Sequence, residues 1–286
     1  MGKKKGLCLY RKMQFIGTGG YGTVYSAVRR SDGLRVAIKK IAAEDCVMCN
    51  CTVSQNIPLE VSMLQQLKNV HGVIQLIDYF ESDGMVYIVM ERVDGQDMFY
   101  FICDHGTLTE DMARNFFKQI VDAVFRCHER GVLHGDIKDD NIMIDLTTGR
   151  ITLIDFGCAA HLHSHVYREY NSAIVCSPPE WIKYKRYTAE GLTTWTLGVL
   201  LYNMLCGDVP FNDQMEIIQA NLTWNKKLNL SDMVKCLIEK CLDRDLSKRL
   251  TLKQIQEHPW LRAPVKEWNM DQTTPRPMRS KGCNIL

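Results

Sequence analysis

The chain has 286 residues, a formal net charge of +2, and 24% charged residues of both signs. This length can bury a large core, as one two-lobed unit or two small domains, and the balanced charge argues against a protein that coats nucleic acid. Its twelve cysteines are scattered and no apolar secretory segment opens the chain, so we expect free thiols in a reducing compartment rather than a disulfide framework.

The N-terminal third has the pattern of β-strands around a glycine-rich loop. Met13–Gly17 leads into the loop 17–22 (Gly-Thr-Gly-Gly-Tyr-Gly), Thr23–Arg30 follows it, and a turn at Asp32-Gly33 precedes a further strand over Leu34–Ile41. A dinucleotide-binding fold would need a helix directly after the glycines, whereas a strand follows here. The sequence therefore predicts that this loop joins two strands of a hairpin.

The loop taken alone has two interpretations. It is an ordinary glycine-rich turn, or Gly17, Gly19 and Gly22 let backbone amides approach a triphosphate without an intervening Cβ. The next strand favours the second interpretation, because alternation puts Lys39 on the same face as the small Ala37, under the loop. A lysine in that place is expected beside the phosphates of a nucleotide.

A carboxylate for Lys39 is available in Pro58–Leu67, a segment with helical spacing that opens on a proline. Glu60, Leu64 and Leu67 fall on one face, so Glu60 projects from an apolar stripe and needs a cation. Pairing with Glu60 would orient Lys39 toward the α- and β-phosphates. The alternative is a helix-start acid favoured by the macrodipole, together with an edge-strand lysine that aids solubility.

The next segments connect this region to a helical one. The CxxCxC spacing of residues 46–51 suits zinc, but no second Cys/His cluster completes four ligands, so we interpret it as a mobile loop with exposed thiols. Met85–Met90 has the pattern of a strand, and Glu91–Gly95 is interpreted as a connector whose backbone would bond adenine, with Met90 behind it. Met112–Arg126 is the clearest amphipathic helix.

Two linked motifs carry the chemistry: residues 134–141 (His-Gly-Asp-Ile-Lys-Asp-Asp-Asn) and 155–157 (Asp-Phe-Gly). Asp136 can accept a proton from an attacking hydroxyl, and Lys138 can neutralise a travelling phosphoryl group. Asn141 and Asp155 can hold magnesium. Each residue alone also suits a turn, a cap or a hinge. Their combination, downstream of a paired lysine, predicts phosphoryl transfer.

Two apolar segments complete the prediction. Residues 142–145 and 150–154 flank Thr148-Gly149 as a short hairpin that ends directly in Asp155, opposite Asn141. The run Trp195–Cys206 is shorter than the ~20 residues of a membrane-spanning helix, so it is expected to be a buried helix.

With these motifs in view, the chain resembles the eukaryotic protein kinases over about residues 10 to 263. Four further segments are similar to the Pim serine/threonine kinases: 131–134 (Gly-Val-Leu-His), 177–182 (Ser-Pro-Pro-Glu-Trp-Ile), 206–211 (Cys-Gly-Asp-Val-Pro-Phe) and 258–260 (His-Pro-Trp). The resemblance implies an α+β, two-lobed protein kinase fold that uses ATP and Mg²⁺ and phosphorylates serine or threonine. It also implies a Glu180–Arg249 pair that braces the C-lobe.

The resemblance divides the chain as follows: a basic segment 1–9, a kinase domain 10–263 (N-lobe 10–91, hinge 92–96, C-lobe 97–263) and a tail 264–286. It assigns catalysis to Asp136, Lys138, Lys39 and Glu60, and metal binding to Asn141 and Asp155. The residues expected around ATP are Ile16, Gly17, Gly19, Gly22, Val24, Ala37, Lys39, Met90, Glu91, Met143 and Ile154.

Three departures from the family pattern affect the prediction. Gly135 replaces the usual arginine, so a basic pocket for an activation-loop phosphate is missing and we expect activity without that phosphorylation. Thr193 replaces an aspartate that normally braces the catalytic loop, and the connector lacks the longer, proline-containing hinge of Pim kinases. Two hypotheses follow: an active Ser/Thr kinase, or a weakened nucleotide-binding pseudokinase that acts as a scaffold.

The expected partners are proteins with Ser or Thr near basic residues, because Asp97 and Asp140 match acidic positions that serve this preference in Pim kinases. Each is otherwise a solvated surface acid. The ending Cys283-Asn284-Ile285-Leu286 has the spacing of a prenylation box, but Asn284 fits the first aliphatic slot poorly, which favours an accidental cysteine. We expect a cytoplasmic monomer, with the nucleus as a second compartment and membrane tethering only if Cys283 is prenylated.

Overall fold

The computed structural model describes residues 6–20, 22–49, 57–265 and 268. Cys51 and Cys283 lie outside these residues, so the model does not test prenylation and places only the first two cysteines of the CxxCxC spacing. Tyr21 of the glycine-rich loop is also outside them.

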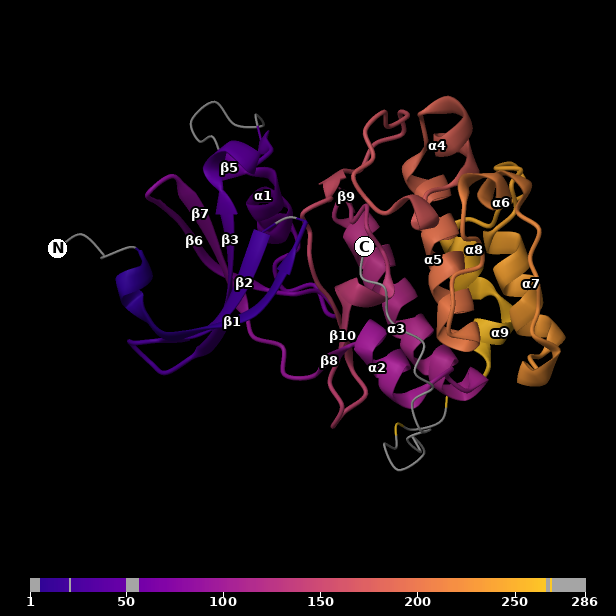
Figure 1. Cartoon of the computed structure of the whole chain (residues 1–286), viewed down its shortest axis with the longest axis horizontal. Helices are drawn as coiled ribbons and strands as arrows, with labels where there is room; N and C mark the ends of the chain where they lie inside the picture. Colours follow the sequence, from indigo (N-terminus) through magenta and orange to yellow (C-terminus); the bar gives the residue numbers. More distant parts are fainter. Residues whose placement is uncertain (1–5, 21, 50–56, 266–267, 269–286) are drawn as a thin grey trace.

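The N-lobe is built on a five-stranded antiparallel sheet in the order β1-β2-β3-β7-β6. Its strands are β1 (Tyr10–Gly19), β2 (Gly22–Arg29), β3 (Arg35–Ala42), β6 (Leu76–Ser82) and β7 (Met85–Glu91), and the helix α1 (Leu59–Gln66) lies beside them (Figure 1). The predicted hairpin around the glycine loop is therefore present. Strand β1 begins before the predicted Met13, because Tyr10 is buried and stacks on Phe80.

The C-lobe is mainly helical (Figure 1). Its helices are α2 (Met98–His105), α3 (Glu110–Glu129), α4 (Pro179–Tyr184), α5 (Ala189–Cys206), α6 (Gln214–Gln219), α7 (Asp232–Cys241), α8 (Leu252–Glu257) and α9 (Pro259–Arg262). Helix α3 contains the predicted amphipathic run and is capped by the Thr109 side chain, which accepts from the Met112 N–H. Helix α5 is buried along most of its length, which explains why it is apolar on every side.

Short elements connect these parts. The strands are β4 (Met48–Cys49), β5 (Ile57–Pro58), β8 (Gln96–Asp97), β9 (Val132–Leu133), β10 (Ile142–Ile144), β11 (Ile151–Leu153) and β12 (Ala160–His161). The 3₁₀ turns are η1 (Leu7–Leu9), η2 (Ala43–Asp45), η3 (Asp139–Asn141), η4 (Ile174–Cys176) and η5 (Lys226–Leu228). None of the helices in the described part of the chain is long and apolar enough to cross a membrane.

The hairpin β10–β11 positions the metal-binding candidates. Ile142 pairs with Leu153, and the Ile154 N–H donates to the Asn141 carbonyl at 2.9 Å. Asn141 therefore precedes one strand of the hairpin and Asp155 follows the other, so antiparallel pairing brings them to the same end. The predicted hairpin is present and it does place Asp155 opposite Asn141.

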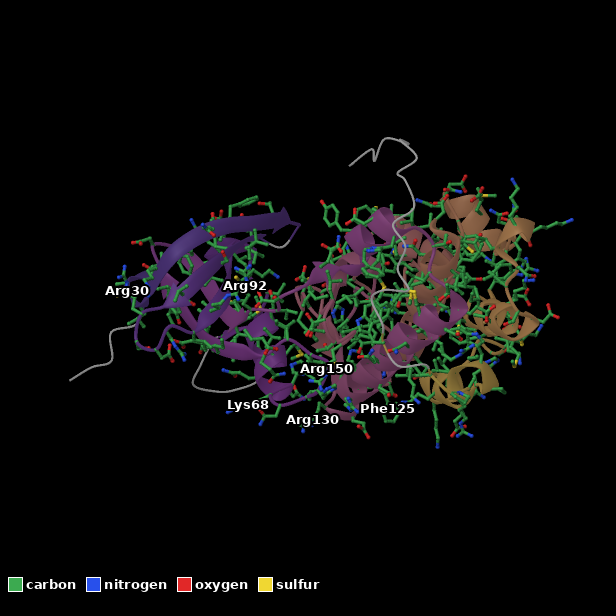
Figure 2. All side chains as sticks on the ribbon, turned by 90° about the horizontal axis from the view of Figure 1, so that it is seen from below. Arg30, Lys68, Arg92, Phe125, Arg130 and Arg150 are labelled. Carbon is green, nitrogen blue, oxygen red and sulfur yellow. The ribbon has the colours of Figure 1, made fainter. Side chains whose placement is uncertain are left out.

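One hydrophobic core extends through both lobes, from Val61 and Ile88 in the N-lobe to Phe156 and Trp195 in the C-lobe. Side chains fill the space between the helices, whereas Lys68 and Arg130 are exposed and lie at the edge of the molecule (Figure 2). Because this core is continuous, the sheet and the helices hold one another in place at the junction of the lobes.

The prediction of a mobile loop with exposed thiols is wrong for Cys49. This residue is buried in β4, and its Sγ lies 3.8 Å from Nε2 of His161. The antiparallel pairing of β4 with β5 and the packing of α1 beside them cover it. Within the described ranges, no group of three or more His, Cys, Asp or Glu side chains is arranged to hold a metal ion.

The Glu180–Arg249 pair is present, with its arginine almost fully buried and 14% of the Glu180 side chain exposed. Two guanidinium nitrogens of Arg249 donate to the Glu180 carboxylate at 2.8 and 2.9 Å, and only 1% of the arginine side chain is exposed. The same guanidinium donates to the carbonyls of Gly191 and Asp243. One residue therefore ties α4, α5 and the segment after α7 together.

We predict that Arg249→Leu lowers the free energy of unfolding by about 3 kcal/mol, because the Glu180 carboxylate is then left buried without its cation. Urea denaturation followed by tryptophan fluorescence measures this loss. Lys248→Leu is the matched control, since Lys248 is 71% exposed and lies 3.6 Å from Asp245, so its removal costs less than ~1 kcal/mol. Equal losses in the two variants would contradict the bracing role.

Candidate active site

Three charged side chains from separate elements meet between the lobes. The Nζ of Lys39 on β3 lies 2.8 Å from Oε1 of Glu60 on α1 and 2.7 Å from Oδ1 of Asp155, which follows β11. Only 5% of the Lys39 side chain and 9% of the Glu60 side chain are exposed. The Lys39–Glu60 pair is the one that the sequence predicts. The contact with Asp155 was not predicted, and it links the two lobes directly.

The electrostatics favour the charged forms of Lys39 and Asp155, whereas burial raises the pKa of Glu60 despite the nearby Lys39 ammonium. Burial by itself would lower the pKa of Lys39, but the carboxylates of Glu60 and Asp155 together raise it above its usual value. Burial would raise the pKa of Asp155, but Lys39 lowers it. The ammonium of Lys39 is thus charged and held in a fixed place, as a lysine that binds phosphate oxygens must be.

Asp155 has a strained backbone. Its φ is 58°, in the left-handed region that residues with a Cβ seldom occupy. Its Oδ1 accepts from the Gly157 N–H at 3.2 Å and from Lys39, so the surrounding contacts fix this conformation. Such strain commonly accompanies functional sites, at a cost of about 1 kcal/mol or more.

The carboxylate of Asp136 is the centre of a second cluster. It is buried, and its Oδ2 accepts from Nδ2 of Asn141 at 2.8 Å and lies 3.1 Å from Nζ of Lys138. Burial would lower the pKa of Lys138, but Asp136 raises it. Nδ2 of Asn141 also donates to the Asp136 carbonyl, which leaves the amide oxygen as the atom suited to a hard cation. Oδ1 of Asp136 accepts a hydrogen bond from the Ser172 hydroxyl.

His134 joins the two clusters, a role that the sequence analysis did not predict. Its Nε2 donates to the Ile154 carbonyl at 3.0 Å, and its Nδ1 accepts from the Asp136 N–H at 3.2 Å. Burial lowers the pKa of His134, so the ring is neutral and can serve as donor and acceptor at once. It connects the loop that carries Asp136 to the strand that ends in Asp155. Its place at the head of the 134–141 motif was the only available signal.

The residues expected around adenine come from both lobes. In the sheet, Val24 pairs with Gly17 and with Lys39, and Ala37 pairs with Met90. Ile16 is half exposed at the end of the sheet, whereas Met143 and Ile154 come from the C-lobe hairpin and its end. Glu91 follows Met90, and both its N–H and its carboxylate bond the backbone of Gln75.

The glycines of the loop differ in what the fold requires. Gly22 has a φ of 126°, and a Cβ there would lie 2.5 Å from the Lys40 carbonyl oxygen, so the backbone itself demands glycine. A Cβ on Gly17 or Gly19 would meet no described atom within 4 Å. The packing of the described residues therefore does not require these two glycines, and their predicted role in the close approach of a ligand stays a prediction.

Comparisons with known proteins agree with this geometry. Residues 10–261 match the family described as "Protein kinase domain". The chain belongs to the protein kinase family. It is 41% identical over 263 residues to serine/threonine-protein kinase pim-2 of Danio rerio, covering 88% of this chain and 84% of that protein. It is 39% identical to serine/threonine-protein kinase prk-2 of Caenorhabditis elegans, covering 91% of this chain and 60% of that protein.

The kinase thus has the two-lobed α+β fold that the resemblance implies, and it is a protein serine/threonine kinase with Pim-like relatives. Serine/threonine protein kinase OSK3 of rice is a more distant relative, 31% identical over 265 residues that cover 91% of this chain and 51% of that protein. The family generally uses ATP and Mg²⁺. Asn141 and Asp155 offer the oxygen ligands that Mg²⁺ prefers, so the residues present fit this cofactor.

Gly135 is required by the backbone of this kinase. Its φ is 82°, and a Cβ would lie 2.4 Å from the Cys158 carbonyl oxygen and 3.2 Å from the carbonyl carbon. Any residue with a Cβ at this position, arginine included, would clash with the Cys158 carbonyl unless the loop backbone moved. The departure from the family pattern therefore affects the path of the backbone as well as the side chain.

Thr193 makes a contact different from the expected brace. It is buried, and its Oγ1 lies 3.3 Å from Nε2 of His128 on α3. The catalytic loop is tied to α5 by another bond, in which Nδ2 of Asn203 donates to Oδ2 of Asp139 at 2.6 Å. Loss of the aspartate at position 193 therefore does not leave the loop without an anchor on α5.

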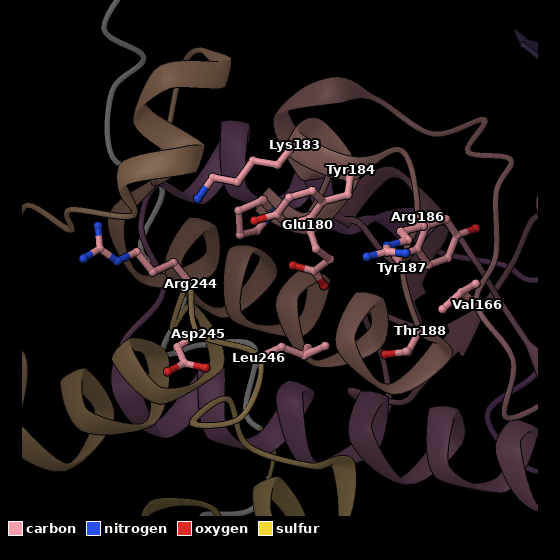
Figure 3. A pocket seen from close by; sticks show the side chains of 11 residues that line it. Val166, Glu180, Lys183, Tyr184, Arg186, Tyr187, Thr188, Arg244, Asp245 and Leu246 are labelled. Atoms are coloured by element: carbon pink, nitrogen blue, oxygen red, sulfur yellow. The ribbon is translucent and has the colours of Figure 1, made fainter.

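A pocket of about 320 Å³ lies in the C-lobe, apart from these groups. Figure 3 shows Glu180 near its centre, with Lys183 and Arg244 on one side and Arg186 on the other. None of the predicted catalytic or nucleotide-binding residues lines it. Its central carboxylate is already bonded by Arg249, so this hollow adjoins a structural ion pair rather than the catalytic groups.

We predict that Gly135→Ala lowers the free energy of unfolding by more than ~2 kcal/mol, because a methyl group adds a backbone clash to left-handed strain. Gly33→Ala is the matched control: Gly33 has a φ of 74° but open space around it, so only the strain of about 1 kcal/mol remains. Gly135→Arg is expected to lower activity rather than restore a family feature. Urea unfolding and a peptide assay measure both effects, and wild-type stability in Gly135→Ala would contradict this account.

His128 makes the stability of the kinase depend on pH. Burial lowers its pKa from 6.5 to about 4, so between these values the unfolded chain binds a proton that the folded chain does not. The stabilisation is complete above pH 6.5 and is lost as the pH falls toward 4. We predict that wild type loses about 2 kcal/mol more unfolding free energy than His128→Gln between pH 7.5 and pH 5. Parallel pH dependences in urea titrations would refute this prediction.

Proposed function

We propose that this kinase is catalytically active and transfers the γ-phosphoryl group of ATP, with Mg²⁺, to serine and threonine hydroxyls of proteins. The observation that carries the proposal is the position of the Lys39 ammonium, whose Nζ lies 2.8 Å from Glu60 Oε1 and 2.7 Å from Asp155 Oδ1, so that it joins the two lobes. A decayed scaffold has no need to keep a buried ammonium aligned with the buried carboxylate of Glu60 and the partly buried carboxylate of Asp155. Gly135 and Thr193, the residues that favoured decay, each have a local structural explanation.

Each side chain has a defined part in this proposal. Asp136 accepts the hydrogen bond of the acceptor hydroxyl and takes its proton, and Lys138 stabilises the charge on the phosphoryl group. Lys39 holds phosphate oxygens of the nucleotide. Oxygen atoms of Asn141 and Asp155 would hold magnesium, which would supply positive charge against the phosphates. The rate gain then comes mainly from alignment and from charges fixed in advance.

The proposal includes activity without phosphorylation of the activation segment. With glycine at position 135, the catalytic loop has no arginine there to receive such a phosphate. Asp136 is already oriented by Asn141 and Lys138 in the unphosphorylated chain. These two observations support a loop that needs no switch to reach its working geometry.

The proposal also includes a preference for basic sequences around the acceptor. Burial raises the pKa of Asp97, and the nearby carboxylate of Asp140 raises it further, so a cation from a substrate would relieve this repulsion. Asp140 is exposed and lies two residues after Lys138. Asp97 also caps α2, because its carboxylate accepts from the Tyr100 N–H at 2.9 Å. Its structural role therefore accompanies the proposed one.

We predict that Asp136→Asn and Lys39→Met each lower phosphate transfer to a basic Ser/Thr peptide by at least ~100-fold, because one removes the proton acceptor and the other the phosphate-binding cation. Radiolabel incorporation with purified protein measures transfer, and thermal unfolding confirms that each variant is folded. If wild type and both variants show the same background label while nucleotide still stabilises the fold, the scaffold hypothesis replaces this proposal.

We predict that Asp140→Asn and Asp97→Asn raise the KM for a basic peptide by about 2- to 5-fold each and leave the KM for a neutral peptide unchanged, since an exposed ion pair contributes ~1 kcal/mol or less. Asparagine at position 97 keeps the helix cap. Asp232→Asn, at a fully exposed carboxylate on α7, is the matched control. An equal rise of KM for both peptides would contradict charge recognition.

A further inference from the structure

The pocket in the C-lobe lies between α4 with the residues that follow it, the activation segment (residues 155–180) and the loop after α7 (Figure 3). Hydrogen bonds tie these three walls to one another. The backbones of Tyr167 and Tyr187 exchange two bonds of 2.8 and 3.1 Å. Arg249 donates to the Glu180 carboxylate on α4 and to the backbone just after α7. The pocket is therefore a fixed part of the fold.

The pocket has a surplus of positive charge. Lys183, Arg186 and Arg244 line it and are exposed, and none of the three makes an ion pair in the part of the chain that the structure describes. The two carboxylates of the lining are already engaged: Glu180 is bonded by its arginine partner, and a lysine ammonium lies 3.6 Å from Asp245. Three positive charges are thus left for which these walls provide no carboxylate.

Exposed apolar side chains line the same pocket. Tyr184, Leu246 and Val166 are 62%, 42% and 43% exposed, and each comes from a different wall. The guanidinium carbon of Arg186 lies 5.8 Å from the centroid of the Tyr184 ring, so this cation is held against the aromatic face. Exposed apolar groups that are gathered in one place and bordered by polar residues are typical of surfaces that bind other proteins.

The positions of the cations decide which kind of ligand fits. Figure 3 shows Lys183 and Arg244 on one side of the pocket and Arg186 on the other, with the carboxylate of Glu180 between them. A single phosphate group binds best where several cations converge on one point, and this arrangement does not converge. A peptide with acidic residues on both sides of an apolar residue matches it, because carboxylates then meet the cations at both sides.

The two ends of this chain do not have that composition. Residues 3–5 are all lysine, and Arg276, Arg279 and Lys281 give the tail an excess of basic side chains. Juxtaposed like charges oppose binding. The matching occupant is therefore a segment of another protein.

We infer that this pocket is a docking site for a partner protein, which it binds through an acidic segment with an apolar residue at its centre. The central side chain packs against Leu246 and Tyr184, and the flanking carboxylates pair with Lys183 and Arg244 on one side and with Arg186 on the other. Docking here requires no transfer of phosphate, so it goes beyond the proposed activity and does not depend on it.

Fluorescence anisotropy of a labelled peptide, Glu-Asp-Glu-Leu-Glu-Asp-Glu, measures the docking; the probe has no side-chain hydroxyl to phosphorylate. We expect Lys183→Glu and Arg244→Glu each to raise its Kd by about 5-fold or more, because a reversed charge replaces attraction by repulsion. A probe with glycine in place of leucine is expected to bind more weakly to wild type, since it lacks the apolar contact. Lys253→Glu, at an exposed lysine of α8 outside the pocket, is the matched control and leaves the Kd unchanged.

The docking site is refuted if the leucine probe shows no saturable binding, or if Lys253→Glu weakens it as much as Lys183→Glu does. Equal binding of the leucine and glycine probes would contradict the apolar contact. Displacement of the probe by tripolyphosphate at lower concentration than by unlabelled peptide would assign the pocket to phosphate groups instead. Self-association in sedimentation runs that Lys183→Glu abolishes would assign it to a second copy of this chain. Asp136→Asn is expected to bind the probe as wild type does, so a failed kinase assay and a failed docking site are distinguishable.

Discussion

The buried contact of Lys39 with both Glu60 and Asp155 is the constraint on which the rest of the site depends. An ammonium taken out of water is tolerated only if carboxylates surround it, and these carboxylates come from α1 and from the segment after β11. The sheet, the helix and the C-lobe hairpin must therefore be in register at once. The continuous hydrophobic core supplies this register, because it runs through both lobes behind the charged groups. The same contact that stabilises the junction places a cation and a metal-ligand candidate where phosphates are expected.

The catalytic loop of this kinase shows how departures from a family pattern are accommodated. Gly135 adopts a left-handed conformation against the Cys158 carbonyl, and His134 takes up the connection between the loop and the strand before Asp155. At the position where an aspartate would brace the loop, the hydroxyl of Thr193 contacts His128 instead. The hydrogen bond from Asn203 to Asp139 anchors the loop to α5, the helix that also carries Thr193. The loop is thus held by neutral and short-range contacts in place of arginine and aspartate. This arrangement is the basis of the proposal that the kinase is active without phosphorylation of its activation segment.

Local patterns in the sequence predicted the strands of the hairpin, the helix that carries Glu60, and the end of β11 at Asp155, because each depends on periodicity or on a turn signal within a few residues. The Lys39–Glu60 pair was predicted because a buried acid on an apolar stripe requires a cation. The contacts of Asp155 with Lys39 and of Ser172 with Asp136 were not predicted, since they depend on how the lobes and the activation segment pack over long distances. Cys49 was placed in an exposed loop for the same reason: the pairing of two-residue strands and their burial beneath neighbouring elements leave no periodic signal.

The central claim is that Asp155, held by Lys39 in this structure, is also the residue through which Mg²⁺ secures the nucleotide. Its most direct test is the thermal unfolding of wild type and Asp155→Asn with a non-hydrolysable ATP analogue, in Mg²⁺ and in EDTA. We expect that Mg²⁺ increases the stabilisation of wild type by the analogue and that this increment is absent from the folded variant. Stabilisation of wild type that is the same in Mg²⁺ and in EDTA, or an increment that persists in Asp155→Asn, would contradict it.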